Sequence, residues 1–281
     1  MRFGHVLVVG AGQMGGGIAQ VLAASGRRVG LLDPAPGAVE RALEAMRSSL
    51  ARIAAKGAGP EPGEVLARIE PVDELVAAGL AIEAIVEDAG AKRELFERLD
   101  EALPADAVLA SNTSSISITM LAAATRRPDR VVGMHFFNPV PVMALVEVIR
   151  GLETSEETAA AVTELAVELG KTPAHARDFP GFVANRILMP LVNEAAYTLM
   201  EGVADAESID TVARLGLNHP LGPLALADLI GLDTCVAIME VLRDGLGDQK
   251  YAPCPLLRQY VEAGRIGRKA GRGFYEYGSG A

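Results

Sequence analysis

The sequence is poor in cysteine and has no long apolar run. Its two cysteines, Cys235 and Cys254, cannot build a disulfide framework, so we expect a reducing, cytoplasmic compartment. Cys235 lies in an apolar helical pattern and is interpreted as a small core residue. No apolar run reaches about 18 residues, and no charged segment precedes an apolar one at the start. The sequence therefore predicts neither a membrane span nor a signal peptide.

Basic residues are also scarce relative to acidic ones. The chain has 26 Lys and Arg against 36 Asp and Glu, which gives a formal net charge of −10. This balance argues against a nucleic-acid or anionic-membrane partner, although local basic residues still allow an anionic substrate. Half of the 281 residues are apolar and 22% are charged, which indicates a globular protein large enough for two domains.

The most informative motif lies near the N-terminus, where the apolar run 6–9 leads into G-x-G-x-x-G. Gly10 permits a tight turn, Gly12 lets a pyrophosphate approach the backbone, and Gly15 lets the next helix pack close to the strand. The helix directs its N–H groups at the phosphates. A second strand ends at Asp33, whose carboxylate suits the adenosine ribose of NAD and repels the 2′-phosphate of NADP. The alternative is a structural glycine turn, with Asp33 as the N-cap of the next helix.

Strand and helix patterns alternate through the first half of the chain. This alternation predicts an α/β fold with a doubly wound, mostly parallel sheet of the Rossmann type. Ligands of such sheets bind at the carboxyl ends of the strands, where we expect Gly10, Asp33, Glu87, residues 111–115 and His135. The expected strands are 6–9, 28–32, 84–86, 107–110, 131–134 and 143–149, and the expected helices are 13–25, 38–56 and 91–103.

From about Pro180 onward, helical patterns dominate. We expect helices over 183–200, 205–215, 224–242 and 255–262, with a bend at Pro190 inside the first. Pro180-Gly181 is interpreted as a hinge. It divides the chain into a dinucleotide-binding domain, 1–179, and a smaller all-helical domain, 180–281. The Gly-rich, basic tail 267–275 is expected to form a loop that returns to a site.

His135 and Glu147 form the main candidate catalytic pair. A histidine at a strand end can act as a general base, because its unperturbed pKa lies near working pH. Taken alone, His135 is better explained as a partly buried histidine with ordinary hydrogen bonds. Glu147, however, interrupts an apolar strand 12 residues later, and a buried carboxylate needs a partner. A His–Glu pair would fix the tautomer and stabilise the imidazolium. The alternative for Glu147 is a position that faces solvent.

Other polar residues have a structural and a functional interpretation. Ser115 and Ser117 are interpreted as N-caps of a helix that begins near residue 116. Asn185, near the start of a helix, is either a cap or a hydrogen-bond donor to a substrate. Lys56 ends a helix beside Ser49, where a positive charge suits the helix dipole.

Together these motifs resemble short-chain L-3-hydroxyacyl-CoA dehydrogenases, and bacterial 3-hydroxybutyryl-CoA dehydrogenases in particular. The resemblance covers nearly the whole chain, and its most specific blocks begin at His135 and Pro180. The matching segments are GAGQMGGGIA from residue 10, EAIVED from 83, SNTSS from 111, HFFNPVPVM from 135, LVEVI from 145, PGFVANR from 180, GPLALADLIGLD from 222 and GRGFY from 271.

The resemblance implies roles for individual residues. His135 would be the base, Glu147 its partner, and Ser114 and Asn185 would bind the substrate at the reacting end. Coenzyme A would contact Ser49 and Lys56. The resemblance implies NAD contacts at Gly10, Gly12, Gln13, Met14, Gly15, Asp33, Glu87, Lys92, Asn112, Ser114, Asn138 and Lys269.

The family also implies a homodimer through the helical domain, and it assigns no residue to a metal. One departure from the family pattern is Ala89-Gly90, where bulkier residues are expected. Small residues there predict a looser helix start before Lys92.

The resemblance leaves several functions open. The expected reaction is reversible, NAD-dependent oxidation of a 3-hydroxyacyl-CoA, with 3-hydroxybutyryl-CoA as the favoured substrate. Alternatives are a 3-hydroxyadipyl-CoA dehydrogenase of aromatic degradation and a gulonate-type sugar-acid dehydrogenase. A non-catalytic, crystallin-like NAD-binding protein is a further alternative, and the intact set of Ser114, His135, Glu147 and Asn185 argues against it.

Overall fold

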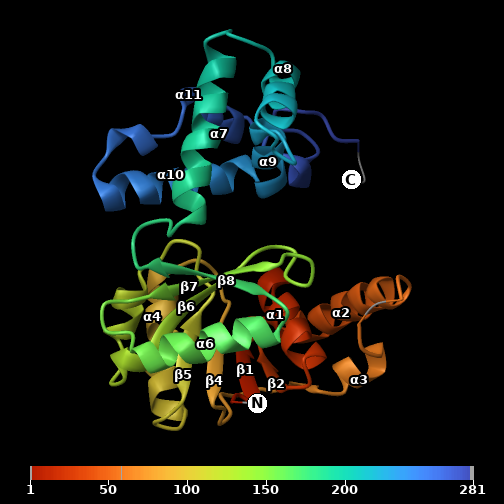
Figure 1. The fold of residues 1–281 in the computed structure, drawn as a ribbon, viewed down its shortest axis with the longest axis vertical. Coiled ribbons are helices and arrows are strands. Elements are labelled where there is room, and N and C mark those ends of the chain that lie inside the picture. The colour runs from red at the N-terminus through yellow and green to blue at the C-terminus, as the bar shows by residue number, and fades with distance from the viewer. Residues whose placement is uncertain (1, 58, 279–281) are drawn as a thin grey trace. The chain divides into compact units, whose positions relative to one another are not determined.

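The computed structural model describes residues 2–57 and 59–278. The chain divides into two compact units, one that ends at Phe179 and one that begins at Pro180 (Figure 1). Each unit has its own hydrophobic core. Within the described residues, no helix is long and apolar enough to cross a membrane.

The first unit is built on an eight-stranded sheet, with the strand order β3-β2-β1-β4-β5-β6-β7-β8. All neighbouring strands are parallel except β6 and β7, which pair antiparallel. The predicted α/β fold with a mostly parallel, doubly wound sheet is therefore confirmed. The strands are β1 His5–Val9, β2 Arg28–Leu32, β3 Ile69–Pro71, β4 Leu80–Glu83, β5 Val108–Ser111, β6 Val131–Phe136, β7 Leu145–Arg150 and β8 Thr172–Arg177.

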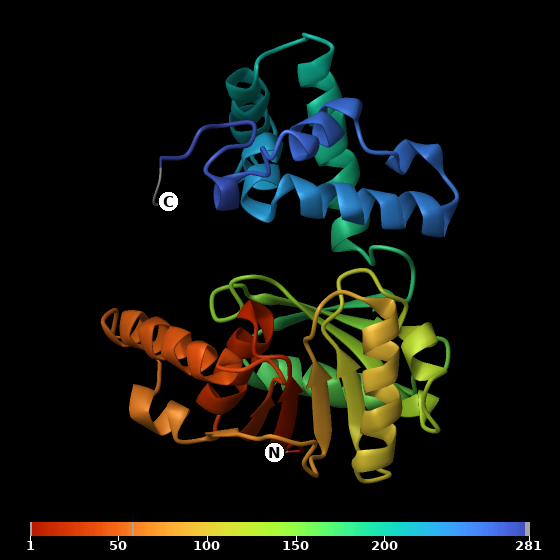
Figure 2. The ribbon, with the colours of Figure 1, turned by 180° about the vertical axis from the view of Figure 1, so that it is seen from behind.

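Helices cover both faces of this sheet. α6 lies over one face in Figure 1, whereas α4 lies in front of the sheet when the unit is seen from behind in Figure 2. α1 shares one hydrophobic core with α6 and with the apolar side chains of β1 and β2. The helices of this unit are α1 Gln13–Ala24, α2 Ala38–Ala54, α3 Pro62–Leu66, α4 Ala89–Ala102, α5 Ile118–Ala122 and α6 Glu156–Glu168, with a one-turn 3₁₀ helix at Pro128–Arg130.

The expected strand over 84–86 is wrong. The strand there is β4, which ends at Glu83, and the apolar triplet after it forms a turn. Ile85 donates its backbone N–H to the Glu83 carboxylate at 2.7 Å, and Val86 is 72% exposed. Three consecutive apolar residues do not indicate at which residue a strand stops pairing with its neighbours. Strands β3 and β8 were not predicted either, because neither has a sustained apolar pattern.

The second unit is helical, as expected, but its longest predicted helix is divided. The expected helix 224–242 is interrupted at Gly231, whose φ of 105° lies outside the helical region, so α9 and α10 are separate. The expected helix 205–215 changes at Val212 from α to a π turn. The helices are α7 Ala184–Met200, α8 Ala206–Thr211, α9 Pro223–Ile230, α10 Leu232–Leu246 and α11 Pro255–Glu262, with 3₁₀ turns at Gln249–Tyr251 and Arg268–Ala270.

The basic tail of the second unit is held down by one buried acid of α9. Asp228 accepts the backbone N–H groups of Phe274 and Tyr275, each at 2.9 Å, and the hydroxyl of Tyr277 at 3.1 Å. A Cβ at Gly273 would overlap the same carboxylate, so a glycine is needed there. The tail therefore folds back on α9 within its own unit.

Candidate active site

The glycine-rich turn joins β1 to α1 and uses each glycine differently. Gly10 has a φ of 103°, and a Cβ there would overlap the carbonyl oxygen of Ala84. A Cβ at Gly15 would overlap the carbonyl oxygen of Gly10. Around Gly12, however, nothing lies within 4 Å of a Cβ position. Gly10 and Gly15 thus serve close packing, and Gly12 presents bare backbone to open space at the start of α1.

Asp33 follows β2 and braces this turn. Its Oδ2 accepts the backbone N–H of Ala11 at 2.7 Å, and its Oδ1 accepts that of Ala35 at 2.9 Å. The alternative role of Asp33 as the N-cap of the next helix is wrong, because α2 begins after Gly37. Asp33 is therefore fixed beside the glycine turn, with carboxylate lone pairs left for further donors.

A cavity of about 520 Å³ opens between the glycine turn, α2 and the segment 138–141. Five residues expected to bind cofactor or coenzyme A share its lining: Gly12, Gln13, Asp33, Ser49 and Asn138. The N-terminus of α1 has no side-chain cap, so its N–H groups and dipole can meet an anion. A bare-backbone helix start with an acid that can take ribose hydroxyls fits an NAD dinucleotide.

Three other expected cofactor residues have contacts of their own. Met14 packs against the core of the first unit. Asn112 accepts the backbone N–H of Phe136 through Oδ1 at 2.9 Å, which ties the end of β5 to β6. Lys269 lies in the second unit and pairs with Asp233 at 2.7 Å. The cofactor roles of these three residues stay predictions.

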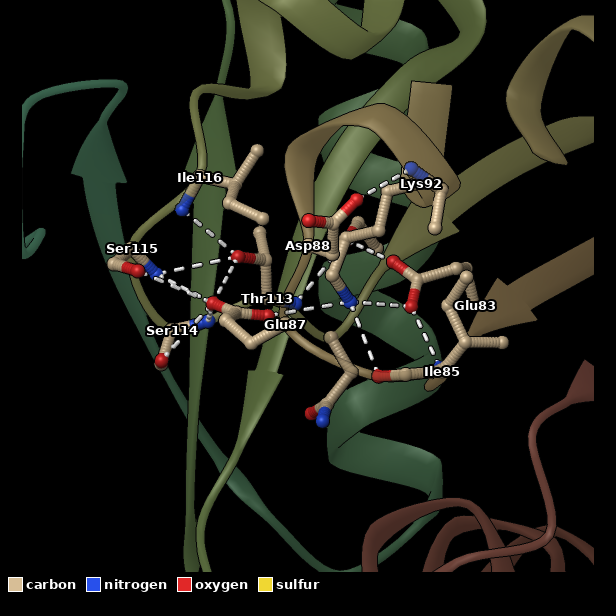
Figure 3. A network of polar contacts seen from close by, with 12 residues as sticks. Glu83, Ile85, Glu87, Asp88, Lys92, Thr113, Ser114, Ser115 and Ile116 are labelled. Atoms are coloured by element: carbon tan, nitrogen blue, oxygen red, sulfur yellow. Dashed lines mark hydrogen bonds and ion pairs between the residues drawn. The ribbon is translucent and has the colours of Figure 1, made fainter. Parts of the chain in front are cut away.

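Glu87 gathers the hydroxyl-rich turn after β5 around one carboxylate oxygen (Figure 3). Its Oε1 accepts the Thr113 hydroxyl at 2.6 Å, and the backbone N–H and hydroxyl of Ser114 at 2.8 and 3.1 Å. Ser115 donates to the same oxygen through its N–H at 3.1 Å and its hydroxyl at 3.2 Å. The turn that carries Ser114 is thus held from one point.

A buried lysine supports this arrangement. Lys92 is 1% exposed and contacts Glu87 Oε2 at 3.3 Å, and it also pairs with Glu83. Burial by itself would raise the pKa of Glu87, but the charge of Lys92 and the bonds from Thr113 and Ser114 outweigh it and hold this pKa below its ordinary value. Glu87 therefore carries its negative charge at neutral pH.

Glu83 is a site residue that was not predicted from the sequence. Its side chain is fully buried; besides Lys92, it accepts the Ser111 hydroxyl at 2.5 Å. The signal was present, because Glu83 is a carboxylate in an apolar strand, like Glu147. The looser helix start expected before Lys92 is also wrong. Asp88 caps α4 by accepting the N–H of Ala91 at 2.8 Å. The helix therefore has an N-cap although the residues at 89 and 90 are small.

His135 and Glu147 face each other across two strands. They are direct partners in the antiparallel register of β6 and β7, and His135 Nδ1 lies 2.7 Å from Glu147 Oε2. Their side chains are 10% and 2% exposed. The contact expected from the sequence is thus present, and the solvent-facing alternative for Glu147 is wrong. β6 continues through Phe136, so His135 lies inside the strand and not beyond its end.

The carboxylate acceptor assigns one proton to Nδ1, which leaves Nε2 as the basic nitrogen of the ring. The ring of Phe137 lies beside the imidazole, with 4.6 Å between ring centroids. An imidazole oriented by a buried carboxylate is the arrangement of a general base.

The expected serine caps are half correct. Ser117 caps α5 by accepting the N–H of Met120 at 3.1 Å. Ser115 is not a cap, because its N–H and hydroxyl turn toward Glu87. The apolar residue at 116 predicted a helix start directly after Ser115, whereas α5 begins at Ile118.

The remaining expected substrate residues lie on helices or at their ends. Asn185 is the second residue of α7 and 9% exposed; the residue at the N-cap position is Val183. Ser49 lines the large cavity from α2. Lys56 is exposed and follows the last residue of α2 by two positions.

Two family models match the chain. The NAD binding domain of 3-hydroxyacyl-CoA dehydrogenase matches residues 5–179, and the C-terminal domain of 3-hydroxyacyl-CoA dehydrogenase matches residues 181–277. The chain belongs to the 3-hydroxyacyl-CoA dehydrogenase family. As a 3-hydroxyacyl-CoA dehydrogenase with the NAD-binding domain of its family, it is an enzyme that uses NAD.

Relatives of this 3-hydroxyacyl-CoA dehydrogenase match over almost their full length. A probable 3-hydroxybutyryl-CoA dehydrogenase of Bacillus subtilis is 56% identical, over 99% of this chain and 98% of the relative. A 3-hydroxybutyryl-CoA dehydrogenase of Bradyrhizobium diazoefficiens is 51% identical, over 96% and 94%. The crystal structure of (S)-3-hydroxybutyryl-CoA dehydrogenase from Ralstonia eutropha is 50% identical and superposes with a TM-score of 0.95, over 99% of this chain and 100% of that one.

Proposed function

We propose that this 3-hydroxyacyl-CoA dehydrogenase oxidises 3-hydroxybutyryl-CoA reversibly to 3-oxobutyryl-CoA, with His135 as the general base. The observation that carries the proposal is the buried contact of 2.7 Å between His135 Nδ1 and Glu147 Oε2. The choice of a four-carbon acyl group rests on the names of relatives that are 56% and 51% identical.

The proposed chemistry divides between cofactor and protein. When bound, NAD⁺ supplies the acceptor for the hydride that leaves C3 of the substrate. His135 Nε2 takes the proton of the C3 hydroxyl, and Glu147 stabilises the positive imidazole through the proton on Nδ1. Because Glu147 is almost fully buried, its charge acts on the ring with little screening by water.

Other residues would bind and orient. Backbone N–H groups at the start of α1 would hold the diphosphate of NAD, and Asp33 the adenosine ribose. Ser114 is proposed to bind an oxygen of the substrate at the reacting end, on a turn that Glu87 holds in place. Asn185 keeps the substrate-binding role that the resemblance implies.

The test is a substrate panel assayed by NADH formation. It comprises 3-hydroxyacyl-CoA thioesters of C4 to C10, 3-hydroxyadipyl-CoA and the free sugar acid gulonate. We expect the highest kcat/KM for the C4 thioester and no turnover of gulonate. A higher value for 3-hydroxyadipyl-CoA or gulonate would replace the proposed substrate. No turnover of any compound would reject the proposed oxidation of 3-hydroxybutyryl-CoA.

A homodimer formed through the helical unit is also proposed. Large apolar side chains of this unit are exposed, which is typical of a surface that another protein chain covers. Sedimentation velocity should give twice the mass of 29.4 kDa, and a monomer at micromolar concentration would contradict the proposal. The most exposed of these residues are Ile187, Val203, Val212, Leu215 and Leu217. The cytoplasmic location stays a prediction from the two cysteines, which are both free and buried.

A further inference from the structure

Gln20 is a buried amide in the middle of α1. Its side chain is 3% exposed, and none of the residues in 2–57 and 59–278 forms a hydrogen bond with it. Buried polar side chains in proteins nearly always have a partner, because an unpaired amide loses its bonds to water. No amide atom of Gln20 is among the fully solvent-excluded, unpartnered side-chain atoms of the described residues, because Gln20 lines a cavity. The amide can therefore take its partner from a ligand in that cavity.

Two cavities meet at Gln20. Gln20 lines the cavity of about 520 Å³ beside the glycine turn, and it also lines a second cavity of about 320 Å³. Pro141 is the other residue that lines both. Along one wall, α2 contributes Met46 and Ser49 to the first cavity and Leu50 and Ile53 to the second. The two cavities are thus neighbours along α1, with Gln20 and Pro141 between them, and we refer to the pair as the α1 groove.

The position of Gln20 along α1 decides which ligand it meets. It lies eight residues after Gly12, which is about 12 Å along a helix axis at about 1.5 Å per residue. The cofactor diphosphate belongs at the first turn of α1, so Gln20 lies well beyond it. Ser49, which the resemblance assigns to coenzyme A, lines the groove on the opposite helix. A thioester that passes Ser49 would reach Gln20 with the arm that follows its sulfur.

We propose that Gln20 is the hydrogen-bond partner of an amide in the pantetheine arm of the thioester substrate, an inference that rests on the proposed function. The pantetheine arm carries two secondary amides, each with one N–H donor and one carbonyl acceptor. The side chain of Gln20 offers one acceptor and two donors, so it can satisfy both groups of one amide. Met46 and Leu50 supply apolar contacts for the methylene and methyl groups on either side. Gln20 would then select a thioester with a long amide-bearing arm over a short acyl compound.

The deciding variant is Gln20→Met, which keeps the length of the side chain and removes its amide. Free coenzyme A and pantetheine serve as probes in calorimetric titrations. We expect Kd to rise about 10-fold for both probes, because a buried ligand amide loses its partner. In steady-state assays, KM for the hydroxybutyryl thioester should rise by the same factor, while kcat and the KM for NAD change less than about twofold.

Thermal unfolding separates this role from a structural one. Gln20→Met should not lower Tm, since the amide it removes has no partner in the fold. Gln259→Met is the matched control, because Gln259 is exposed on α11. If Gln20→Met does not fold, Gln20→Asn, which shortens the same amide, is measured in its place and should weaken both probes.

Either of two results would overturn the role of Gln20. One is unchanged Kd for both probes, and the other is a lower Tm combined with equal weakening of NAD and coenzyme A. If wild type turns over 3-hydroxybutyryl-CoA and Gln20→Met has the same kinetic constants, the role of Gln20 is rejected and the proposed function stands. A wild-type protein that binds neither probe and turns over no thioester would reject the proposed function itself.

Discussion

At the scale of single residues, one carboxylate and one imidazole carry the proposed chemistry. His135→Gln should lower kcat by about two to four orders of magnitude, the usual range for a general base, and leave NAD binding intact. Glu147→Gln should also lower kcat, because a neutral amide cannot balance an imidazolium. Steady-state kinetics with 3-hydroxybutyryl-CoA measure both.

The matched control is His175→Gln. His175 lies on β8, in register with Val148 of β7, and it is exposed. This exchange should leave kcat within about twofold of wild type. Near-normal turnover by His135→Gln would place the base elsewhere.

Asp33 should decide between the two nicotinamide cofactors. Its carboxylate lies beside the glycine turn, where the 2′-phosphate of NADP would meet a negative charge. We expect kcat/KM for NAD to exceed that for NADP by about 100-fold or more, equivalent to roughly 3 kcal/mol. Asp33→Ala should narrow this ratio. A wild-type preference for NADP would contradict the role given to Asp33.

At the scale of elements, the turn after β5 depends on the ionised form of Glu87. The pKa of Glu87 is lowered from its ordinary value of 4.5, so its contribution to folding is complete above that value and lost as the pH falls below it. Glu87→Gln should lower the free energy of unfolding by about 1 kcal/mol at pH 7. The effect is modest because Glu87 is partly exposed. The variant should also lose less stability than wild type between pH 5 and about pH 3.

Urea unfolding at several pH values measures this difference. Glu94→Gln is the control, because Glu94 is exposed on the same helix. Its unfolding free energy should follow that of wild type at every pH. Parallel pH profiles for wild type and Glu87→Gln would show that the charge of Glu87 does not hold the turn.

The helices and strands themselves were predictable from periodic apolar spacing, whereas the residues at which some of them end were not. The helix after the glycine turn and the strands that lead to Asp33 and His135 followed from apolar spacing. The end of β4 did not, because Ile85 and Val86 are apolar and yet belong to a turn. The break between α9 and α10 depends on a positive φ at Gly231. A glycine inside a helical pattern does not by itself indicate that the helix is interrupted there.

Most individual residues of the candidate site were predictable from the sequence, whereas most contacts between them were not. His135 and Glu147 were paired from the need of a buried carboxylate for a partner. The five contacts of Glu87 with residues 113–115 arise only when β4 and β5 lie side by side. The support of Lys92 by Glu83 depends on the turn that joins β4 to α4. Gln20 had no sequence signal, because an amide at one position of an apolar helix does not show whether it is paired.

At the scale of the whole molecule, an acidic protein must bind a polyanionic substrate. The net charge of −10 repels coenzyme A at long range, so local positive charge is needed near its phosphates. Lys56→Ala should raise the KM for the thioester about fivefold at low ionic strength, roughly 1 kcal/mol, and the KM for NAD should hardly change. The effect should shrink as salt is added.

Arg47→Ala is the control for this prediction, because Arg47 is an exposed cation of α2, the helix that precedes Lys56. It should leave the KM for the thioester near the wild-type value at every salt concentration. A thioester KM that Lys56→Ala does not change at low ionic strength would leave Lys56 as a charge that suits the end of a helix.

The cross-strand register of β6 and β7 has a consequence for how this enzyme can vary. His135 meets Glu147 because the two strands pair opposite each other, whatever the length of the chain that joins them. A slip of one residue would turn Glu147 to the other face of the sheet and separate the pair. Insertions or deletions in the connection 137–144 that preserve the register would leave the pair intact. Evolution and protein engineering can therefore reshape the surroundings of the base through the length of this loop, whereas the two strands accept only exchanges of one side chain for another.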